Sequence, residues 1–392
     1  MTGIDLADGL PPDLIAEAVS WRHHLHRHPE LAFNERQTAD FVASQLSHFG
    51  LAVHRGLAGT GVVGTLTRGT SRRTIAIRAD MDALPIQEQS GAPHTSCNHG
   101  IMHACGHDGH VAMALAAARV CARLSDLDGT VHFIFQPAEE NEGGGRRMVE
   151  DGLFQLFPCD AVYALHNWPA LPPGTCVARD GEMMAAFATF EIAISGRGCH
   201  GAMAHEGTDS IVAGCQLVSA LQSIVSRNID PLQASVVSAT QVHAGDTWNV
   251  IPDSCVIRGS TRWFDDRVGD MLERRITELS RSIAAGFGCE ANVRYERRGL
   301  ATINDPAKAS FVRAVASAPP LNLAIADARP SMGSDDFAFM MQVVPGCYLW
   351  LGSGRSGDNH GLHSPRYDFN DALLPLGVAL WVSLVRRSLT CT

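Results

Sequence analysis

Acidic, imidazole and thiol side chains gather in a few short stretches of the first half of the chain. The segment RADMDALP at 78–85 carries two carboxylates, Asp80 and Asp82, separated by one residue. The segment MHACGHDGH at 102–110 combines a thiol, three imidazoles and a further carboxylate. Imidazole, thiolate and carboxylate are the usual ligands of zinc and of neighbouring divalent metals. These stretches predict a metal site on which Cys105 and His107 converge.

Three later stretches add groups of the same kind. QPAEENEGGG holds the adjacent carboxylates Glu139 and Glu140, ALHNWP holds His166, and GLHSPRYDFND holds His363. Adjacent acids at a strand end suit a division of labour in which one binds metal and the other remains free as a general base. Five ligands of mixed type would hold two ions.

Each group also has an ordinary structural explanation. A strand-end histidine can be a satisfied polar residue, an adjacent glutamate pair can be surface charge, and paired aspartates can cap a turn. The cluster at 102–110 favours metal binding, because so many ligating groups are costly to bury for packing alone. His103 and His110 remain open between supporting and structural roles. The run RHHLHRH at 22–28 lies on an amphipathic helix and is interpreted as structural.

The elements that must position these groups alternate between helices and strands. Apolar periodicity predicts helices over 14–28, 35–49 and 109–124, and strands over 62–66, 74–78, 130–135 and 161–166. The chemical groups follow the strand ends, which is where open α/β sheets place their ligands. An α/β sheet with helices on both faces is expected.

The pattern changes in the middle of the chain. It predicts a strand, a helix, two strands, a helix and a strand, over 187–195, 210–227, 235–243, 254–264, 267–287 and 289–295. This βαββαβ order is typical of a ferredoxin-like unit. Strand and helix segments resume at 347–352 and 371–388. We therefore predict a catalytic domain made of residues 1–185 and 298–392, split by an inserted domain at 186–297.

Composition and charge argue against several classes of protein. The 392 residues carry a net charge of −10, with a pI near 6.0, which leaves no basic field for nucleic acid. The N-terminus lacks the pattern of a signal peptide, and we expect no stretch apolar enough to span a bilayer. The 11 scattered cysteines, without a CxxC pair, favour reduced thiols over a redox function. We expect a cytoplasmic protein that binds neither nucleic acid nor membrane.

The chain resembles the metal-dependent amidohydrolases that include hippurate hydrolases, N-acyl-amino-acid deacylases and indole-acetyl-amino-acid hydrolases, which are relatives of carboxypeptidase G and aminoacylase. The resemblance covers nearly the whole chain. It is carried, in order, by LHRHPELAFNE, RADMDALP, MHACGHDGHVAM, FQPAEE, HNWPALPPG, GRGCHGAMAH, NVIPD, GSDDF and LHSP. It implies a two-domain α/β protein, in which a mixed-sheet, metallopeptidase-like catalytic domain carries a ferredoxin-like insert serving as lid and dimerisation domain.

The resemblance also implies an activity, the hydrolysis of hippurate-like N-acyl-L-amino acids to a carboxylic acid and a free amino acid. Two divalent ions, manganese or zinc with cobalt and nickel as alternatives, would be held by Cys105, His107, Glu140, His166 and His363. A water between the ions would attack the amide, with Glu139 as general base and Asp82 orienting a ligand imidazole. His200 would polarise the scissile carbonyl, in cis or from a partner subunit. Asn249 and Arg262 would lie near the substrate carboxylate.

Three positions depart from the usual pattern of these enzymes. Cys199 stands where glycine is common, Ala204 where proline is common, and Asp335 where glutamate is common. None removes a candidate ligand or the base, so the departures bear on substrate shape. The alternative function is a dipeptidase or carboxypeptidase on the same dinuclear centre. A catalytically idle binding protein would have lost Glu139 or a ligand, and neither is lost. A homo-oligomer, either a dimer or a tetramer formed through the inserted domain, is expected.

Overall fold

The computed structural model describes residues 10–140, 142–355, 357 and 359–390, and the chain divides into two compact units. The first unit contains the described residues up to 183 together with 302–329 and those from 335 onward. The second contains residues 184–301 and 330–334. The return of 330–334 to the second unit is a feature that no sequence pattern marked.

The first unit is built on an eight-stranded mixed sheet with the order β1-β2-β4-β3-β5-β16-β6-β15. Its strands are β1 (Ala52–Leu57), β2 (Gly61–Arg68), β3 (Thr74–Asp80), β4 (Gly129–Gln136), β5 (Ala161–Trp168), β6 (Thr175–Val177), β15 (Ala324–Ile325) and β16 (Gly346–Gly352). The central neighbours β4, β3, β5 and β16 are parallel, so their carboxyl ends lie at one edge of the sheet. Their nearly continuous apolar runs reflect burial on both faces.

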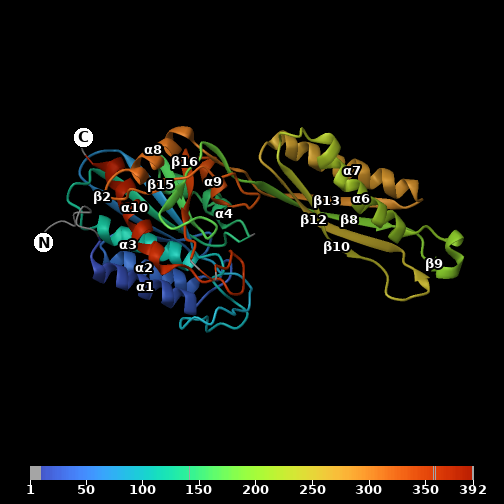
Figure 1. Cartoon of the computed structure of the whole chain (residues 1–392), viewed down its shortest axis with the longest axis horizontal. Helices are drawn as coiled ribbons and strands as arrows, with labels where there is room; N and C mark the ends of the chain where they lie inside the picture. The colour runs from blue at the N-terminus through green and yellow to red at the C-terminus, as the bar shows by residue number, and fades with distance from the viewer. Residues whose placement is uncertain (1–9, 141, 356, 358, 391–392) are drawn as a thin grey trace. The chain divides into compact units, whose positions relative to one another are not determined.

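Helices cover both faces of this sheet (Figure 1). One face carries α1 (Pro12–Arg27), α2 (Arg36–His48), α3 (His107–Cys121), α8 (Pro306–Ser317) and α10 (Leu374–Leu389). The other face carries α4 (Gly144–Glu150) and α9 (Phe337–Met341). Strand alternation explains the division, because Tyr348 of β16 packs on Phe337 while its neighbour Leu349 joins the main core. Shorter elements are α5 (Leu153–Leu156), η3 (Asp371–Leu373) and the strand pair β7 (Gly181–Met184) with β14 (Thr302–Asn304).

The last helix corrects one expectation from the sequence. The helical stretch Asp371–Leu389 is long and apolar enough, by length and composition alone, to cross a membrane. However, 61% of this apolar stretch is buried inside the protein, and α10 packs against α3. Its apolar composition is therefore that of a core helix, which is apolar on most of its surface because most of that surface is buried.

The second unit is a four-stranded antiparallel sheet in the order β10-β12-β8-β13, with two helices packed on it. Its elements are β8 (Ala186–Ser195), α6 (Ser210–Asn228), β10 (Ser235–His243), β12 (Ser254–Trp263), α7 (Asp266–Gly286) and β13 (Glu290–Gly299). Alternate residues of β8 are buried under the helices. A small extension contains β9 (Cys199–His200), η2 (Gly201–Glu206) and β11 (Val250–Ile251). The predicted ferredoxin-like βαββαβ order, and with it the two-domain α/β fold class, is confirmed.

Candidate metal centre

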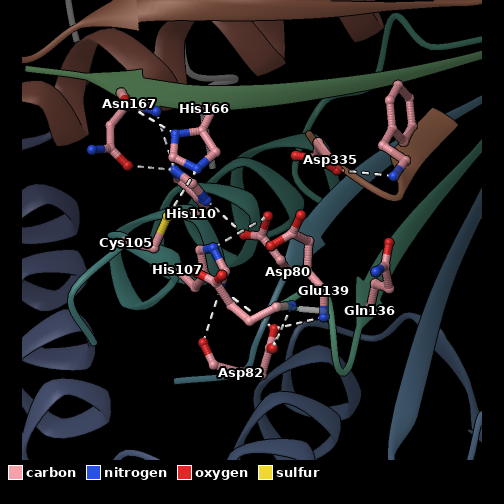
Figure 2. A network of polar contacts seen from close by, with 12 residues as sticks. Asp80, Asp82, Cys105, His107, His110, Gln136, Glu139, His166, Asn167 and Asp335 are labelled. Atoms are coloured by element: carbon pink, nitrogen blue, oxygen red, sulfur yellow. Dashed lines mark hydrogen bonds and ion pairs between the residues drawn. The ribbon is translucent and has the colours of Figure 1, made fainter. Parts of the chain in front are cut away.

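The candidate ligands come together because they follow parallel strands. Glu139 and Glu140 follow β4, His166 lies near the end of β5, and His363 lies in the segment after β16. The loop between β3 and α3 supplies the thiol of Cys105, and the first residue of α3 supplies the imidazole of His107. Carboxyl ends of parallel strands share one edge of a sheet, so residues far apart in the sequence meet there. Figure 2 shows Cys105, His107, Glu139 and His166 of this group at close range.

Three overlapping clusters contain all five candidate ligands and Glu139. They are Cys105 with His107 and His166, Cys105 with Glu140 and His363, and His107 with Glu139 and Glu140. Within each cluster one ligand atom per residue lies within 4.8 Å of the others. The thiol Sγ of Cys105 is 3.4 Å from His166 Nε2, and His363 Nε2 is 3.1 Å from Glu140 Oε1. Because the clusters share members, the ligand atoms of all six residues form one continuous group at this edge of the sheet.

Two imidazoles are oriented by backbone carbonyls. His107 Nδ1 donates to the carbonyl of Asp82 at 2.9 Å, and His166 Nδ1 donates to the carbonyl of Asn167 at 2.8 Å. A carbonyl oxygen can only accept, so Nδ1 of each ring carries a proton, and when the ring is neutral Nε2 is the nitrogen with the free lone pair. Among the described residues the buried Nε2 of His107 has no hydrogen-bond partner. A cation would satisfy this nitrogen, and the thiol, imidazole and carboxylate donors around it suit zinc or a similar ion.

Two side chains of the site, Glu139 and His107, have raised pKa values. Burial raises the pKa of Glu139 well above its ordinary value, and the nearby Asp335 and Glu140 raise it further. Burial alone would lower the pKa of His107, but the carboxylates of Asp80 and Asp82 outweigh burial and raise it to about 10. Crowded carboxylates in a buried space repel one another and retain protons. A bound cation would reverse this effect, since its charge favours deprotonated ligands.

Asp82 supports both glutamates through the backbone. Its Oδ1 accepts from the Glu139 amide at 3.0 Å, and its Oδ2 accepts from the Glu140 amide at 2.9 Å. Oδ1 also lies 3.4 Å from His107 Nδ1. One buried carboxylate thus holds the turn that carries the candidate base and positions a candidate ligand.

Two backbone bends present ligands in left-handed conformations that non-glycine residues rarely adopt. Ala138 has φ 55° and His363 has φ 65°. The amide of Ala138 donates to Glu35 Oε1 at 2.9 Å, and that of His363 donates to the carbonyl of Ala104 at 2.8 Å. Sequence reasoning missed Glu35, a fully buried residue that no spacing connects with the site. Its only signal was its place in the string LHRHPELAFNE.

His110, left open by the sequence, supports the site from behind. Its Nδ1 is 2.6 Å from Asp80 Oδ1, and its Nε2 is 2.7 Å from Asn167 Oδ1. Asp80 in turn lies 3.7 Å from His107 Nε2 and pairs with the buried Arg78 at 2.7 Å. These partners were not assigned from the sequence. Buried charge of this kind must be paired, so Arg78 and His110 allow Asp80 to stay ionised beside the centre.

A second wall of carboxylates was also missed. Asp335 and Asp336 form a cluster with Glu139, and Arg78 lies 3.2 Å from Asp335 and 3.3 Å from Asp336. Gln136 Nε2 donates to Asp336 Oδ1 at 2.6 Å. The string GSDDF was noted for its resemblance, but nothing in it showed that its acids would face the Glu139 loop.

The three remaining predicted residues lie in the second unit. His200 and Asn249 are close together, because β9 pairs with β11 and the Gly201 amide donates to the Asn249 carbonyl at 2.7 Å. Arg262 pairs with Phe187 at the opposite end of β8, and its Nη1 donates to Ser334 Oγ at 2.7 Å. A strand of 10 residues spans roughly 30 Å at about 3.3 Å per residue. One copy of this unit therefore does not bring His200 and Arg262 together.

Comparison with known proteins identifies the class to which this fold and site belong. The model of peptidase family M20/M25/M40 matches residues 76–387. Hippurate hydrolase of Campylobacter jejuni is 38% identical, covering 96% of this chain and 98% of its own length, and N-acetyl-L-cysteine deacetylase of Bacillus subtilis is 38% identical, covering 91% and 85%. The crystal structure of the Bacillus subtilis YXEP protein, a dinuclear metal binding peptidase from the M20 family, matches with a TM-score of 0.83 and 32% identity, over 96% of this chain and 98% of that one.

The chain belongs to peptidase family M20/M25/M40. It is an amidohydrolase of that family, and the resemblance, fold class and enzyme class predicted from the sequence are confirmed.

Proposed function

We propose that the protein hydrolyses the amide bond of N-acyl-L-amino acids, with hippurate-like compounds as the first substrates to test. The products are a carboxylic acid and a free amino acid. The observation that carries the proposal is the pair of overlapping clusters that share Cys105, with Glu139 beside them. The names of the two relatives, a hippurate hydrolase and an N-acetyl-L-cysteine deacetylase, support the substrate class.

Five side chains are proposed to hold two divalent ions: Cys105, His107, Glu140, His166 and His363. The buried Nε2 of His107, which has no hydrogen-bond partner among the described residues, supports this assignment, as does the mixture of donor types. Thiolate and imidazole favour zinc or cobalt, while carboxylate and imidazole also accept manganese or nickel. When bound, such ions polarise a carbonyl oxygen and lower the pKa of water.

Glu139 is proposed to take the proton of the attacking water and later to pass it to the leaving amine. Its place in one cluster with His107 and Glu140 supports this role, because a general base must lie within reach of the proton that it takes. Asp82 keeps Glu139 in place by accepting a hydrogen bond from the Glu139 backbone amide. The chain's own groups thus hold the base and orient a ligand before substrate arrives.

The substrate-binding assignments are also part of the proposal. Arg262 and Asn249 are proposed to bind the substrate carboxylate, and His200 to donate to the carbonyl oxygen. Arg262 pairs with Phe187 near the start of β8, whereas His200 follows the end of that strand. Because the length of β8 separates them, we propose that His200 acts from a second copy of the chain. This arrangement requires at least a dimer formed through the second unit.

The test is hydrolysis by chelator-stripped protein resupplied with zinc, manganese, cobalt or nickel. Substrates are hippurate, N-acetyl-L-cysteine, other N-acyl amino acids, and dipeptides. We expect metal-restored cleavage of N-acyl amino acids, with kcat/KM reduced about 10²–10⁴-fold in Glu139→Gln. Glu142→Gln, an exposed residue in the same loop, is the matched control and should behave as wild type. Cleavage of dipeptides alone would replace the proposal with a dipeptidase, and full activity of Glu139→Gln would refute the assigned base.

A further inference from the structure

The histidine-rich start of the chain contains a buried arginine that the proposed reaction does not use. Arg22 of α1 is 0% exposed. Its Nη1 lies 3.3 Å from Asp108 Oδ2 and 3.1 Å from Asp368 Oδ1, and its Nε lies 2.6 Å from Asp371 Oδ1. Removing a guanidinium from water is expensive unless it is paired. Its burial is therefore sustained by carboxylates from two distant parts of the chain.

Both of those parts supply candidate metal ligands. Asp108 directly follows His107 at the start of α3, and Asp368 and Asp371 follow His363 in the segment that leads into α10. Close to the ligands, the two segments are joined by the hydrogen bond that the His363 amide donates to the Ala104 carbonyl. Behind, the Arg22 guanidinium joins them through its carboxylates. Arg22 thus connects the two ligand segments without touching either ligand.

Neighbouring groups reinforce the same connection. His26, one turn further along α1, places Nδ1 2.8 Å from Asp108 Oδ2. His94 Nε2 lies 2.9 Å from Arg22 Nη2 and 2.9 Å from Asp368 Oδ1. Asp108 is therefore held twice from α1. A network in which each charge is paired fixes its members more firmly than single contacts do.

We propose that Arg22 is a positioning residue of the metal centre. By holding Asp108 and Asp368 on one guanidinium, it fixes the spacing between the Cys105–His107 loop and the His363 loop. The cluster of Cys105, Glu140 and His363 draws ligands from both loops. The ion in that cluster is therefore the one whose affinity Arg22 sets. This inference rests on the proposed function, since it presumes that the five ligands bind ions.

The experiment measures cobalt binding to the full chain stripped of metal. A chromophoric chelator competes for Co²⁺, and the thiolate-to-cobalt absorption reports the geometry at Cys105. We expect Arg22→Met to weaken one of the two ions at least about 10-fold and to alter the absorption, as loss of a supporting partner does at other metal sites. Asp368→Asn, which weakens the pairing of Arg22 with the His363 side but leaves its pairing with Asp108 in place, should show a smaller change in the same direction.

The matched control is Arg119→Met. Arg119 pairs with Glu17, so it joins the same two helices, α1 and α3, but it lies near the end of α3 remote from His107. We expect wild-type binding and spectrum from this variant. A folded Arg22→Met protein, checked by circular dichroism, with wild-type affinity and absorption would overturn the inference. If Arg22→Met does not fold, unchanged affinity for both ions in Asp368→Asn would overturn it instead. A wild-type chain that binds no pair of ions would refute the proposed function as well, which is a distinct result.

Discussion

Replacing Asp82 by asparagine tests how the turn that carries Glu139 is held. The two carboxylate oxygens each accept one backbone amide, those of Glu139 and Glu140, and the side chain is 1% exposed. Asparagine has the same shape but only one accepting oxygen, and its NH2 group donates. One backbone N–H of the pair would therefore face another donor with no water to replace the lost partner.

The magnitude follows from the two bonds. A hydrogen bond to a charged group contributes about 1.5–3 kcal/mol, and a neutral one about 0.5–1.5 kcal/mol. Losing one charged bond costs about 1.5–3 kcal/mol and converting the other from charged to neutral costs about 1–1.5 kcal/mol, which together make about 2.5–4.5 kcal/mol. If the turn stays in place, the free energy of unfolding falls by that amount. If it relaxes, part of the cost appears in kcat/KM instead, at tenfold for each 1.4 kcal/mol or so, because Glu139 and Glu140 move.

The assay is urea unfolding together with kcat/KM on the substrate that the hydrolysis panel identifies. Asp209→Asn is the matched control, because a single oxygen of Asp209 accepts both the Ile211 and the Val212 amides, at 2.9 and 3.0 Å. Asparagine can keep both of those bonds, so the control should cost much less. Wild-type stability and wild-type kcat/KM in Asp82→Asn would refute the role assigned to this carboxylate.

Two further substitutions test the packing around the site. Burial lowers the pKa of His26, but Asp108 and Glu88 outweigh burial and raise it from 6.5 to about 9. This histidine therefore contributes stability that is fully present below pH 6.5 and is lost as pH rises through about 9. The difference in unfolding free energy between wild type and His26→Gln should shrink across that window, and a constant difference would contradict the assignment. Gly109→Ala would place a Cβ 2.3 Å from the Phe369 ring, so we expect a loss of about 1–3 kcal/mol and a lower melting temperature. Gly286→Ala, where no described atom beyond the adjacent residues and the nearby backbone of α7 lies within 4 Å of the added Cβ, should not lower it.

The secondary structure around the site was largely predictable because local patterns specify it. The apolar runs that predicted strands at 130–135 and 161–166 lie within β4 and β5, and the helix predicted from 109 begins two residues earlier, at His107. The short strands β6, β7, β14 and β15 were not predicted. Strands of two to four residues carry too little periodicity to be read, and their neighbours in the sheet determine them.

Supporting residues were harder to predict than candidate ligands. Cys105 and His107 stand in a dense motif, so their chemistry is visible in the residue types alone. Glu35, Arg78 and Arg22 act through contacts with segments far away in the sequence, such as the Arg22–Asp368 pair. No periodicity or spacing encodes a contact between α1 and a segment after β16. These residues therefore looked like ordinary members of helices and strands.

The sequence by itself determined which residues have ligand chemistry, that they follow strand ends, and that a βαββαβ unit interrupts the chain. Tertiary structure decided which of those strand ends are neighbours. The parallel order β4-β3-β5-β16 brings Glu139, His166 and the loops after β3 and β16 to one edge, and charges such as Arg22 become buried partners behind them. The physical reason is that hydrophobic patterning is local and short in period, whereas strand order and the pairing of buried charges depend on contacts between distant segments that form only in the folded protein.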